Sequence, residues 1–514
     1  MTELPTKTAT TTFRSPKGKE IQVSILDECK LHLLKCGRCQ RKRKSLEISM
    51  ENILGLDSKR NIQRRTSQVS IETISSGNEG PKNSQLIIHY VNKLSQKWTL
   101  SKVELVHTDV KLLVSLKERI CAFLCSINRP KRLLFYINPF GGERKAETIF
   151  EKTVKPLLEI AGVQYDMELT LRRNHALDSI QSRTDLENDF DGVVSVGGDG
   201  MFSEVFNGVL RRGGSSNRAS IRVGIIPAGS TDALALSLHG TRDVLTCVLH
   251  ILLGDGRNVD LTAIYTKDQE GSYILDRYSM AMVSYGYFGD LLKRSENYRW
   301  MGPKRYDYCG FRTFLANQSF DGTLNFVGRE ENYTDSIICS ESCQVCENTT
   351  TMDLDSGIIS KMITGRFMAI TVATLTCACE KTPNGISPFS HLGDGYADVI
   401  LVDICSRFQY FKYLIRTGFK NTPSPFSLPF VRTYKVREMT FQPCNVKTSV
   451  WNCDGEIIQN PSIRIIVHCQ ILPVFARGIA PKKVKPRKKL SFCPWSFTKR
   501  RRQEQVRSSL VSTN

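Results

Sequence analysis

The 514-residue sequence lacks any run of about 18–20 apolar residues, which is the length that a membrane-spanning helix requires. Its first residues, MTELPTKTATTTFR, also lack the apolar core of a secretory signal. We therefore expect a cytoplasmic protein whose association with membranes is peripheral. In that reducing compartment, the 17 cysteines favour metal ligands or structural thiols over disulfides.

Acidic residues are in deficit, with 51 Asp and Glu against 71 Lys and Arg, and the formal net charge is +20. A balance of this kind implies an acidic partner, such as nucleic acid, anionic lipid or a phosphorylated substrate. Part of the excess is concentrated in Arg41–Lys44 and between Lys482 and Arg502. No helix-turn-helix, zinc-finger or RNP pattern accompanies these runs, so we expect no nucleic-acid partner.

The sequence also lacks the GxxxxGK[ST] motif of P-loop enzymes and the HRD and DFG motifs of protein kinases. Its length exceeds what one hydrophobic core usually organises, so we expect several domains. Apolar content is ordinary, at 40%, which favours a mostly folded chain.

Residues 11–127 show short, alternating apolar runs and then helical spacing over Asp109–Ile127. A polar stretch, Asp57–Ser84, interrupts them and is typical of a long loop. This pattern predicts a small barrel of the pleckstrin-homology type that targets membranes. The predicted helix lacks the tryptophan usual in such domains.

Residues 130–259 alternate apolar strands with helical stretches, which predicts a parallel, Rossmann-like α/β domain. Residues 260–478 contain fewer long helical patterns and predict a β-sandwich domain that completes a cleft. Residues 479–514 are basic and predicted to be disordered. The expected fold class is thus α/β plus β, preceded by the barrel.

Three glycine-rich turns follow predicted strands of the α/β domain, at Asn138–Gly142, Gly197–Gly200 and Pro227–Asp232. Glycine permits positive φ and lets backbone approach a phosphate closely. Ligands of parallel sheets bind at the carboxyl ends of the strands, where these turns fall. The three turns together predict a phosphate-binding cleft.

Asp199 lies within the second turn, in the segment SVGGDGMFSEV. The surrounding glycines would clear space for its carboxylate to reach a hydroxyl beside a nucleotide, with the following helix directing its amino terminus at the phosphates. Asp is also a preferred helix N-cap, so a purely structural role is the alternative.

Several blocks of the sequence resemble the diacylglycerol-kinase-like superfamily of lipid kinases, and within it the ceramide kinases. They are INPFGG, VSVGGDGMFSEV, VGIIPAGSTD, YGYFGD with YRWMGPKRYD, CSESCQVC, HLGDG and WNCDGE, in that family's order, between about Arg132 and Gly478. The resemblance implies transfer of the γ-phosphoryl group of ATP, with Mg²⁺, to the primary hydroxyl of a lipid. It implies an α/β nucleotide domain facing a β-sandwich.

The resemblance also assigns residues to the site. Asp199 matches the general base, and Gly197, Gly198, Asp199 and Gly200 match the segment that meets the lipid headgroup. The positions that match nucleotide contacts are Asn138, Pro139, Phe140, Gly141, Gly142, Thr170, Leu171, Arg172, Arg173, Asn174, Glu204, Gly229, Ser230, Thr231, Arg299, Arg305, Asp454, Gly455 and Glu456. From the residues alone, Arg299 and Arg305 could equally be surface charges, and Asp454 and Glu456 turn residues.

Two positions bear on the lipid. Sphingosine kinases resemble this chain but carry an acid at the position of Leu292, where a carboxylate suits a cationic amine. An apolar residue favours the neutral amide of ceramide, and Met201 likewise resembles ceramide kinases. The expected reaction is phosphorylation of ceramide to ceramide 1-phosphate. The alternatives are a sphingosine or diacylglycerol kinase, or a non-catalytic lipid-binding pseudokinase.

Cys339, Cys343 and Cys346 are closely spaced, and thiolates at such spacing can hold Zn²⁺ if a distant fourth ligand closes the site. The alternative is a set of buried or unpaired thiols. A nearby CAC segment adds Cys377 and Cys379, whereas CGRC at Cys36–Cys39 is expected to be a hairpin turn.

Two basic segments are candidate contact surfaces. Ser406–Lys420 resembles the Ca²⁺–calmodulin target of ceramide kinases, with Phe408, Leu414 and Phe419 as anchors, although a core-facing helix fits equally. The tail mixes Lys and Arg with Phe492, Trp495 and Phe497, which suits anionic phospholipids or, alternatively, a solvated or nuclear-targeting tail.

Overall fold

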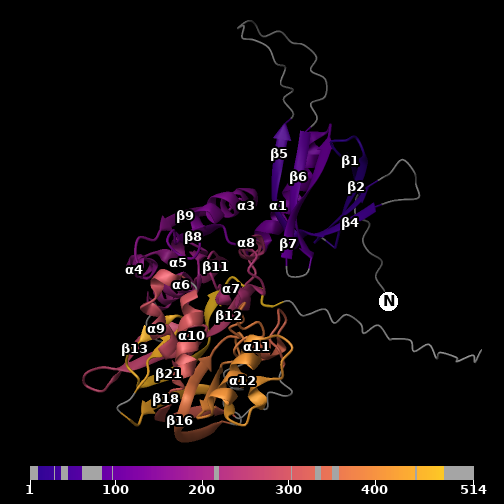
Figure 1. The fold of residues 1–514 in the computed structure, drawn as a ribbon. Coiled ribbons are helices and arrows are strands. Elements are labelled where there is room, and N and C mark those ends of the chain that lie inside the picture. The colour runs from indigo at the N-terminus through magenta and orange to yellow at the C-terminus, as the bar shows by residue number, and fades with distance from the viewer. Residues whose placement is uncertain are drawn as a thin grey trace, which may run out of the picture. The chain divides into compact units, whose positions relative to one another are not determined.

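Three groups of elements follow one another along the chain, and their order can be traced by colour in Figure 1. The computed structural model describes residues 10–27, 29–35, 44–60, 84–94, 97–212, 219–302, 304–329, 337–349, 358–445 and 448–479. All of the described elements belong to one unit, which ends at Ala480. The predicted turn at Cys36–Cys39, most of the run at Arg41–Lys44 and the basic tail lie outside the described residues.

The first group is a seven-stranded antiparallel sheet followed by a helix. Its strands run in the order β4-β3-β2-β1-β7-β6-β5. Alternate residues of β2 point into the core, as the period-2 pattern predicts, and α1 covers that core with Leu113, Leu116 and Ile120. The elements are β1 (Thr11–Arg14), β2 (Glu20–Leu26), β3 (Lys30–Lys35), β4 (Lys44–Ser49), η1 (Met50–Asn52), β5 (Ile53–Arg60), β6 (Ser84–Leu94), β7 (Lys97–His107) and α1 (Val110–Ser126).

The predicted loop Asp57–Ser84 is wrong at both ends, because β5 continues to Arg60 and β6 begins at Ser84. The polar end of β5 looks like a loop by composition. Its residues nevertheless pair in register with β6, and the Asp57 carboxylate lies 3.0 Å from Nε2 of His89 on that strand. Cross-strand pairing therefore outweighs local composition here. Residues 61–83 lie outside the described residues.

The second group is the predicted parallel α/β domain, with strands in the order β9-β8-β10-β11. Ile137 pairs with Val196, and Gly197 pairs with Pro227, so the three glycine turns leave the same edge of the sheet side by side. The elements are β8 (Arg132–Ile137), α2 (Ala146–Ile149), η2 (Phe150–Val154), α3 (Lys155–Ala161), β9 (Gln164–Leu169), α4 (His175–Ser182), α5 (Leu186–Asp189), β10 (Gly192–Gly197), α6 (Asp199–Arg212), β11 (Arg222–Pro227), α7 (Ala233–His239) and α8 (Val244–Leu252).

The third group is mostly antiparallel strands, as predicted, but it also contains helices that strand patterns did not reveal. Its strands are β12 (Arg257–Lys267), β13 (Tyr273–Ser279), β14 (Met282–Gly286), β15 (Phe320–Arg329), β16 (Ile359–Ala373), β17 (Ala397–Asp403), β18 (Val431–Pro443), β19 (Trp451–Cys453), β20 (Glu456–Ile458) and β21 (Ile463–Val474). Its helices are α9 (Tyr287–Glu296), η3 (Arg299–Met301), α10 (Lys304–Ala316), α11 (Gln344–Asn348), α12 (Arg407–Gly418) and η5 (Pro425–Ser427).

The last strand joins the second and third groups. β21 pairs antiparallel with β12 and β18, and its end, Val474, then pairs parallel with Val223 of β11. Phe475 packs so closely on the parallel sheet that a Cβ at Gly192 would lie 2.4 Å from its ring. Residues far apart in the sequence thus close one continuous sheet.

A buried amide makes a second connection between these groups. Asn207 on α6 is 4% exposed, and its side chain donates to the carbonyl of Tyr278 and accepts from the N–H of Tyr278 on β13. This pair of hydrogen bonds fixes one wall of the cleft to the other.

Asn207→Ala should lower the melting temperature of the protein, measured by differential scanning calorimetry. The substitution leaves the N–H and C=O of Tyr278 buried without partners, at a cost of ~1–3 kcal/mol for each unsatisfied group. Ser182→Ala is the matched control, because that exposed hydroxyl bonds only to the Ser179 carbonyl. Equal melting temperatures for the two variants would contradict this role for Asn207.

Candidate active site

A cavity of about 500 Å³ lies at the edge of the sheet where the glycine turns emerge. Its volume falls within the range of about 300–1,000 Å³ that small-molecule sites occupy. The lining residues are Asn138, Phe140, Gly141, Thr170, Arg172, Arg173, Asn174, Leu177, Gly200, Met201, Ser203, Glu204, Asn207, Arg211, Asp276, Arg277 and Glu456. Both the α/β domain and the β-rich part of the chain therefore contribute walls.

The first glycine turn is shaped by its own asparagine. The Asn138 carboxamide accepts hydrogen bonds from the N–H groups of Phe140 and Gly141, at 2.9 and 3.0 Å. Gly142 has φ of 56° and approaches the third turn so closely that a Cβ there would lie 2.6 Å from the carbonyl oxygen of Ala228. Any side chain at this position would push the first and third turns apart.

The second and third turns also touch. A Cβ at Gly229 would lie 2.6 Å from Cα of Gly198, so Gly229 could not carry a side chain at this contact. Three backbone segments consequently crowd together with their amides near the cavity, which is the arrangement that an anion-binding loop requires. Pro139, Gly142, Gly197, Gly198 and Gly229–Thr231 support this edge without lining the cavity itself.

Asp199 is a cap, but of a helix other than its own. Its two carboxylate oxygens accept hydrogen bonds from the N–H groups of Ala233 and Leu234, at 3.0 and 2.9 Å, at the start of α7. Burial raises the pKa of the Asp199 carboxyl, and these two donors partly oppose the rise. The carboxylate is thereby held rigidly beside the glycine turns, with a proton affinity above that of an ordinary aspartate.

A second acid, Asp232, accompanies Asp199. Asp232 accepts a hydrogen bond from the N–H of Gly229 at 2.9 Å and adopts φ of 49°. Burial first, and then the negative charge of Asp199, raise the pKa of Asp232 to about 6. Sequence reasoning included Asp232 only as the end of a turn, because no local pattern showed that α7 would bring the two acids together.

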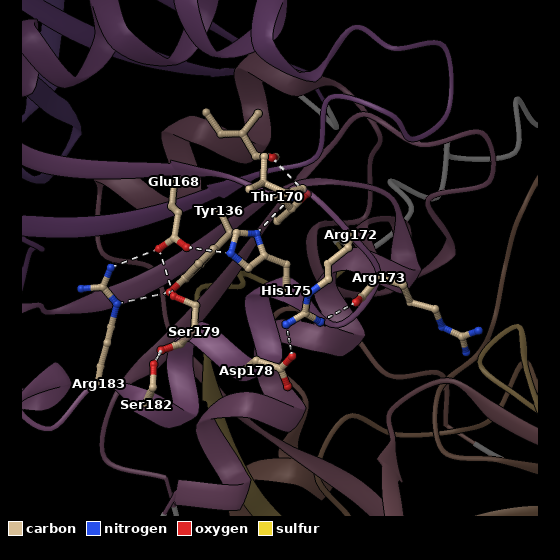
Figure 2. Close-up of polar contacts among 12 residues, drawn as sticks. Tyr136, Glu168, Thr170, Arg172, Arg173, His175, Asp178, Ser179, Ser182 and Arg183 are labelled. Atoms are coloured by element: carbon tan, nitrogen blue, oxygen red, sulfur yellow. Dashed lines mark hydrogen bonds and ion pairs between the residues drawn. The ribbon is translucent and has the colours of Figure 1, made fainter.

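Polar contacts with neighbouring side chains hold the segment Thr170–Asn174 in place (Figure 2). The His175 ring accepts from the N–H of Leu171 at 3.0 Å, and its Nε2 lies 3.3 Å from Glu168. Arg172 pairs with Asp178 at 2.6 Å, whereas Figure 2 shows Arg173 extending away from this group. Thr170 and Arg172 to Asn174 line the cavity, but Leu171 is exposed.

Glu204 lines the cavity and has one carboxylate oxygen that forms no hydrogen bond. Its pKa is raised by burial and lowered in part by hydrogen bonds from the backbone N–H groups of Asn174 and Ala176. One oxygen, Oε2, is buried with no hydrogen-bond partner, although the residue lines the cavity. An unsatisfied buried acceptor is costly, so this oxygen is available to a donor group of a bound ligand.

The two acids of the predicted DGE turn have different surroundings. Asp454 is buried and accepts hydrogen bonds from the N–H groups of Met280, Ala281 and Met282, where the chain passes from β13 to β14. Glu456 instead lines the cavity, where its carboxylate forms ion pairs with Arg173 and with Arg277, the latter at 3.7 Å.

Arg299 and Arg305 do not line the cavity. Both lie near Glu296, with Arg299 in a direct ion pair and Arg305 at 3.9 Å. The structure thus supports the surface-charge alternative for these two residues as much as a nucleotide contact, and their assignment stays a prediction.

The three predicted cysteines converge with a histidine. The ligand atoms of Cys339, Cys343, Cys346 and His391 all lie within 4.8 Å of one another. The Cys339 and Cys346 sulfurs are 3.7 Å apart, and Nδ1 of His391 is 3.2 Å from the Cys343 sulfur. The thiols of Cys377 and Cys379 instead form hydrogen bonds with the Leu375 carbonyl and the Thr382 hydroxyl, respectively. His391 belongs to the HLGDG block, but no spacing rule connected it to the cysteines.

The cavity has further walls that the sequence did not identify. They are Leu177, Met201, Ser203, Asn207, Arg211, Asp276 and Arg277. Asn207 and Arg211 follow Glu204 at helical spacing on α6, so that periodicity could have found them. Arg277 comes from β13, and only the pairing of distant strands brings it to the site.

No helix in the described part of the chain is long and apolar enough to cross a membrane. This finding agrees with the absence of an apolar run in the sequence.

Comparisons with known proteins place these features in a family. Residues 132–264 match the diacylglycerol kinase catalytic domain, and residues 280–450 match the ceramide kinase C-terminal domain. The chain is 35% identical over 452 residues to ceramide kinase of Mus musculus, covering 76% of this chain and 83% of that protein. It is 33% identical over 403 residues to ceramide kinase 1 of Caenorhabditis elegans, covering 74% and 70%. The chain belongs to the ceramide kinase family, within the diacylglycerol-kinase-like lipid kinases.

Proposed function

We propose that this protein is an ATP-dependent ceramide kinase, which transfers the γ-phosphoryl group to the primary hydroxyl of ceramide and releases ceramide 1-phosphate. The observation that carries the proposal is the cavity of about 500 Å³ that is lined by residues of two glycine turns, by arginines and by Glu204. Asp199 does not line this cavity, but it is held between the lining residue Gly200 and the N–H groups at the start of α7. The chain belongs to the ceramide kinase family, and this membership supports ceramide as the lipid substrate. A sphingosine or diacylglycerol kinase is the alternative within the same chemistry.

The nucleotide would occupy the cavity. The amides of the turns at Asn138–Gly142 and Gly229–Thr231 would face the phosphates, as phosphate-binding loops do. The unpartnered oxygen of Glu204 would accept a hydrogen bond from the sugar or base. Arg173 and Arg277 also line the cavity and supply positive charge. The proposed domains are a barrel at 11–127, the nucleotide domain at 130–259 and a β-sandwich at 260–478.

Asp199 is the proposed general base. Phosphoryl transfer depends mainly on positioning and on neutralising charge, so the base has only to orient the hydroxyl and accept its proton. Asp199 is fixed by two backbone N–H donors, and burial raises its pKa, which improves its match to a hydroxyl proton.

Mg²⁺ fits the donors present near the turns, since it prefers carboxylate oxygens together with substrate phosphates. Asp232 provides such an oxygen beside Asp199, which leaves Asp199 to accept the hydroxyl proton. Bound there with the triphosphate, the ion would neutralise charge on the transferred group.

The lipid assignment uses the position of Leu292. This side chain is 6% exposed on α9 and carries no charge, so the chain does not place a carboxylate there for a cationic amine. A neutral amide lipid is therefore favoured over sphingosine.

Incubating the pure protein with Mg²⁺–ATP and detergent-dispersed ceramide, sphingosine or diacylglycerol should give the highest kcat/KM for ceramide. Asp199→Asn should lower kcat by roughly 10²–10⁴, the contribution typical of a general base, while ATP binding measured by calorimetry persists. Near-normal turnover by that variant would mean that another group takes the proton, and a preference for another lipid would reject ceramide as the substrate.

The pH profile of the same reaction provides a second readout. The base must be ionised, so its raised pKa should place the acidic fall in kcat at a higher pH than an ordinary aspartate would. Asp232→Asn keeps an acceptor for the Gly229 N–H and tolerates positive φ. It removes a neighbouring negative charge, so the acidic limb should move to lower pH. If the acidic limb did not move in this variant, the charge of Asp232 would not influence the group that titrates.

Glu456→Ala should raise the KM for ATP and leave the KM for ceramide nearly unchanged. The carboxylate holds Arg173 and Arg277 in position at the cavity wall, and without it two like charges repel each other. Steady-state kinetics with each substrate varied provide the measurement. A lower KM for ATP would show the opposite, that Glu456 competes with phosphate for these arginines. Glu151→Ala, which breaks the exposed ion pair with Lys155 outside the cavity, is the control and should leave both KM values unchanged.

The Cys339–Cys343–Cys346–His391 cluster is proposed to bind Zn²⁺ for structural purposes. A tetrahedral site with Zn–S bonds of about 2.3 Å places sulfurs about 3.8 Å apart, and Cys339 and Cys346 are separated by 3.7 Å. Four ligands without a solvent position are typical of structural zinc.

Elemental analysis of the full-length protein should find one zinc ion per chain. Cys343→Ser and His391→Ala should each lose most of the metal and lower the melting temperature, because the site contributes folding energy. Cys444→Ser, at an exposed thiol outside the cluster, should change neither quantity. Zinc-free wild-type protein, with melting unchanged in Cys343→Ser, would reject the site.

Peripheral attachment to cytoplasmic membrane surfaces completes the proposal, because ceramide resides in bilayers. Anionic phospholipids are the proposed partners of the basic segments. Ca²⁺–calmodulin remains a candidate partner of Ser406–Lys420, although Tyr410, Tyr413 and Thr417 on α12 are buried.

A further inference from the structure

Large apolar side chains are exposed on three neighbouring elements of the β-rich part of the chain. Trp300 on η3 is 81% exposed, Phe311 on α10 is 60% exposed and Phe408 on α12 is 78% exposed. We call this surface the aromatic rim and define it by Trp300, Tyr308, Phe311, Leu315, Phe408, Phe411 and Phe419, all of which are exposed. Isolated exposed apolar residues are ordinary, but a cluster of this kind marks an interaction site.

The spacing of these residues puts them on the outer faces of two helices. On α10, Tyr308, Phe311 and Leu315 follow at i, i+3 and i+7, and on α12 Phe408 and Phe411 do the same at i and i+3. The inner face of α12 carries Tyr410, Tyr413 and Thr417, which are buried. Each helix is therefore apolar on both sides, and only one side is used by the core.

Ring contacts join the elements into one surface. The rings of Phe314 on α10 and Phe411 on α12 are 5.9 Å apart, and those of Tyr298 beside η3 and Tyr308 on α10 are 5.1 Å apart. The helices α10 and α12 also lie against each other in the backbone (Figure 1). The rim is consequently a continuous face built on rigid helices.

Basic side chains surround the rim. Those exposed on the same helices or at their ends are Lys304, Arg312, Arg407, Lys412 and Lys420. The nearby acids are already paired, Asp307 with Lys381 and Glu296 with Arg299. The uncompensated charge of the surface is therefore positive.

We propose that the aromatic rim inserts into an anionic lipid bilayer and holds the catalytic cleft at the membrane surface. Aromatic rings settle at the level of lipid headgroups, and Lys and Arg beside them pair with anionic lipids. The inference rests on the proposed function, because a bilayer substrate gives the rim its occupant. It adds a membrane contact within the catalytic part of the chain, separate from the amino-terminal barrel and the tail.

A calmodulin-like protein is the competing occupant of α12, and the structure favours the bilayer. Recognition of an amphipathic helix in a groove uses its main apolar face. On α12 that face includes Tyr410, which is 0% exposed, so the helix would have to leave the core. A bilayer needs only the outer face, and it also accounts for Trp300 and Phe311, which lie on other elements.

Fluorescence quenching by brominated lipids tests insertion in the full-length chain. Trp98 and Trp451 are 5% and 0% exposed, so in a Trp495→Phe background Trp300 is the remaining tryptophan that can meet lipid. Vesicles of phosphatidylcholine and phosphatidylserine with brominated acyl chains should quench this protein. They should not quench the Trp300→Phe, Trp495→Phe double variant. Absence of quenching in protein that co-sediments with the vesicles would overturn the proposal.

Affinity and activity supply the second test. Phe311→Ser with Phe408→Ser should weaken binding to these vesicles by roughly tenfold or more, whereas Met362→Ser, at a 70% exposed residue on β16, should bind as the wild type does. Activity on detergent-dispersed short-chain ceramide should stay within about twofold of wild type for both variants.

The remaining outcomes separate the hypotheses. If the variant with Phe311→Ser and Phe408→Ser kept wild-type affinity for vesicles and lost Ca²⁺–calmodulin binding, the rim would be assigned to calmodulin and the bilayer would be rejected. Failure of the wild-type protein to phosphorylate ceramide in detergent would reject the proposed function, and the quenching result would still report on insertion.

Discussion

The close contact between the second and third glycine turns is the constraint on which the site depends. Cα of Gly198 lies so near Gly229 that no Cβ fits, and Gly142 approaches Ala228 just as closely. Because three backbone segments can touch only without side chains, their amides gather at one edge of the sheet. The same proximity brings the start of α7 under Asp199, which then accepts two of its N–H groups. The packing of the turns, the gathering of their amides and the placement of Asp199 therefore share one geometric cause.

The cleft requires a second constraint, since its walls come from different parts of the chain. Asn207 ties α6 to Tyr278, Asp454 organises the break between β13 and β14, and β21 runs from the antiparallel strands to the edge of the parallel sheet. These links are buried and hydrogen-bonded, so they resist relative movement of the walls. The ion pairs of Glu456 with Arg173 and Arg277 are more exposed, and a bound ligand can rearrange these side chains.

The sequence predicted what depends on local pattern. Alternating strands and helices located the parallel sheet, and glycines after strands located the edge at which the cavity lies, because both signals are periodic or conformational. It could not predict contributions that come from tertiary pairing. Arg277, Asp232 and His391 reach their sites through strand pairing or loop packing between distant segments, which leaves no trace in spacing. The end of β5 was mistaken for loop since its residues are polar and only its partner strand makes it extended. The sequence also misses helix α10, because its outer face carries Tyr308, Phe311 and Leu315 and obscures the usual amphipathic pattern.

The charges of the protein are arranged by depth. Within the cavity the arginines are compensated, with Arg172 held by Asp178 and Arg173 by Glu456. Around the aromatic rim and in the runs near both ends, basic residues are in excess, which accounts for a net charge of +20. Compensated charge within a partly buried site limits the cost of desolvation and keeps the arginine side chains in place beside the cavity. Uncompensated charge at the surface acts over a Debye length and attracts an anionic membrane before contact. The two proposed ligands are thus different kinds of anion, a phosphate inside and a lipid surface outside, and they would bind with little competition between them.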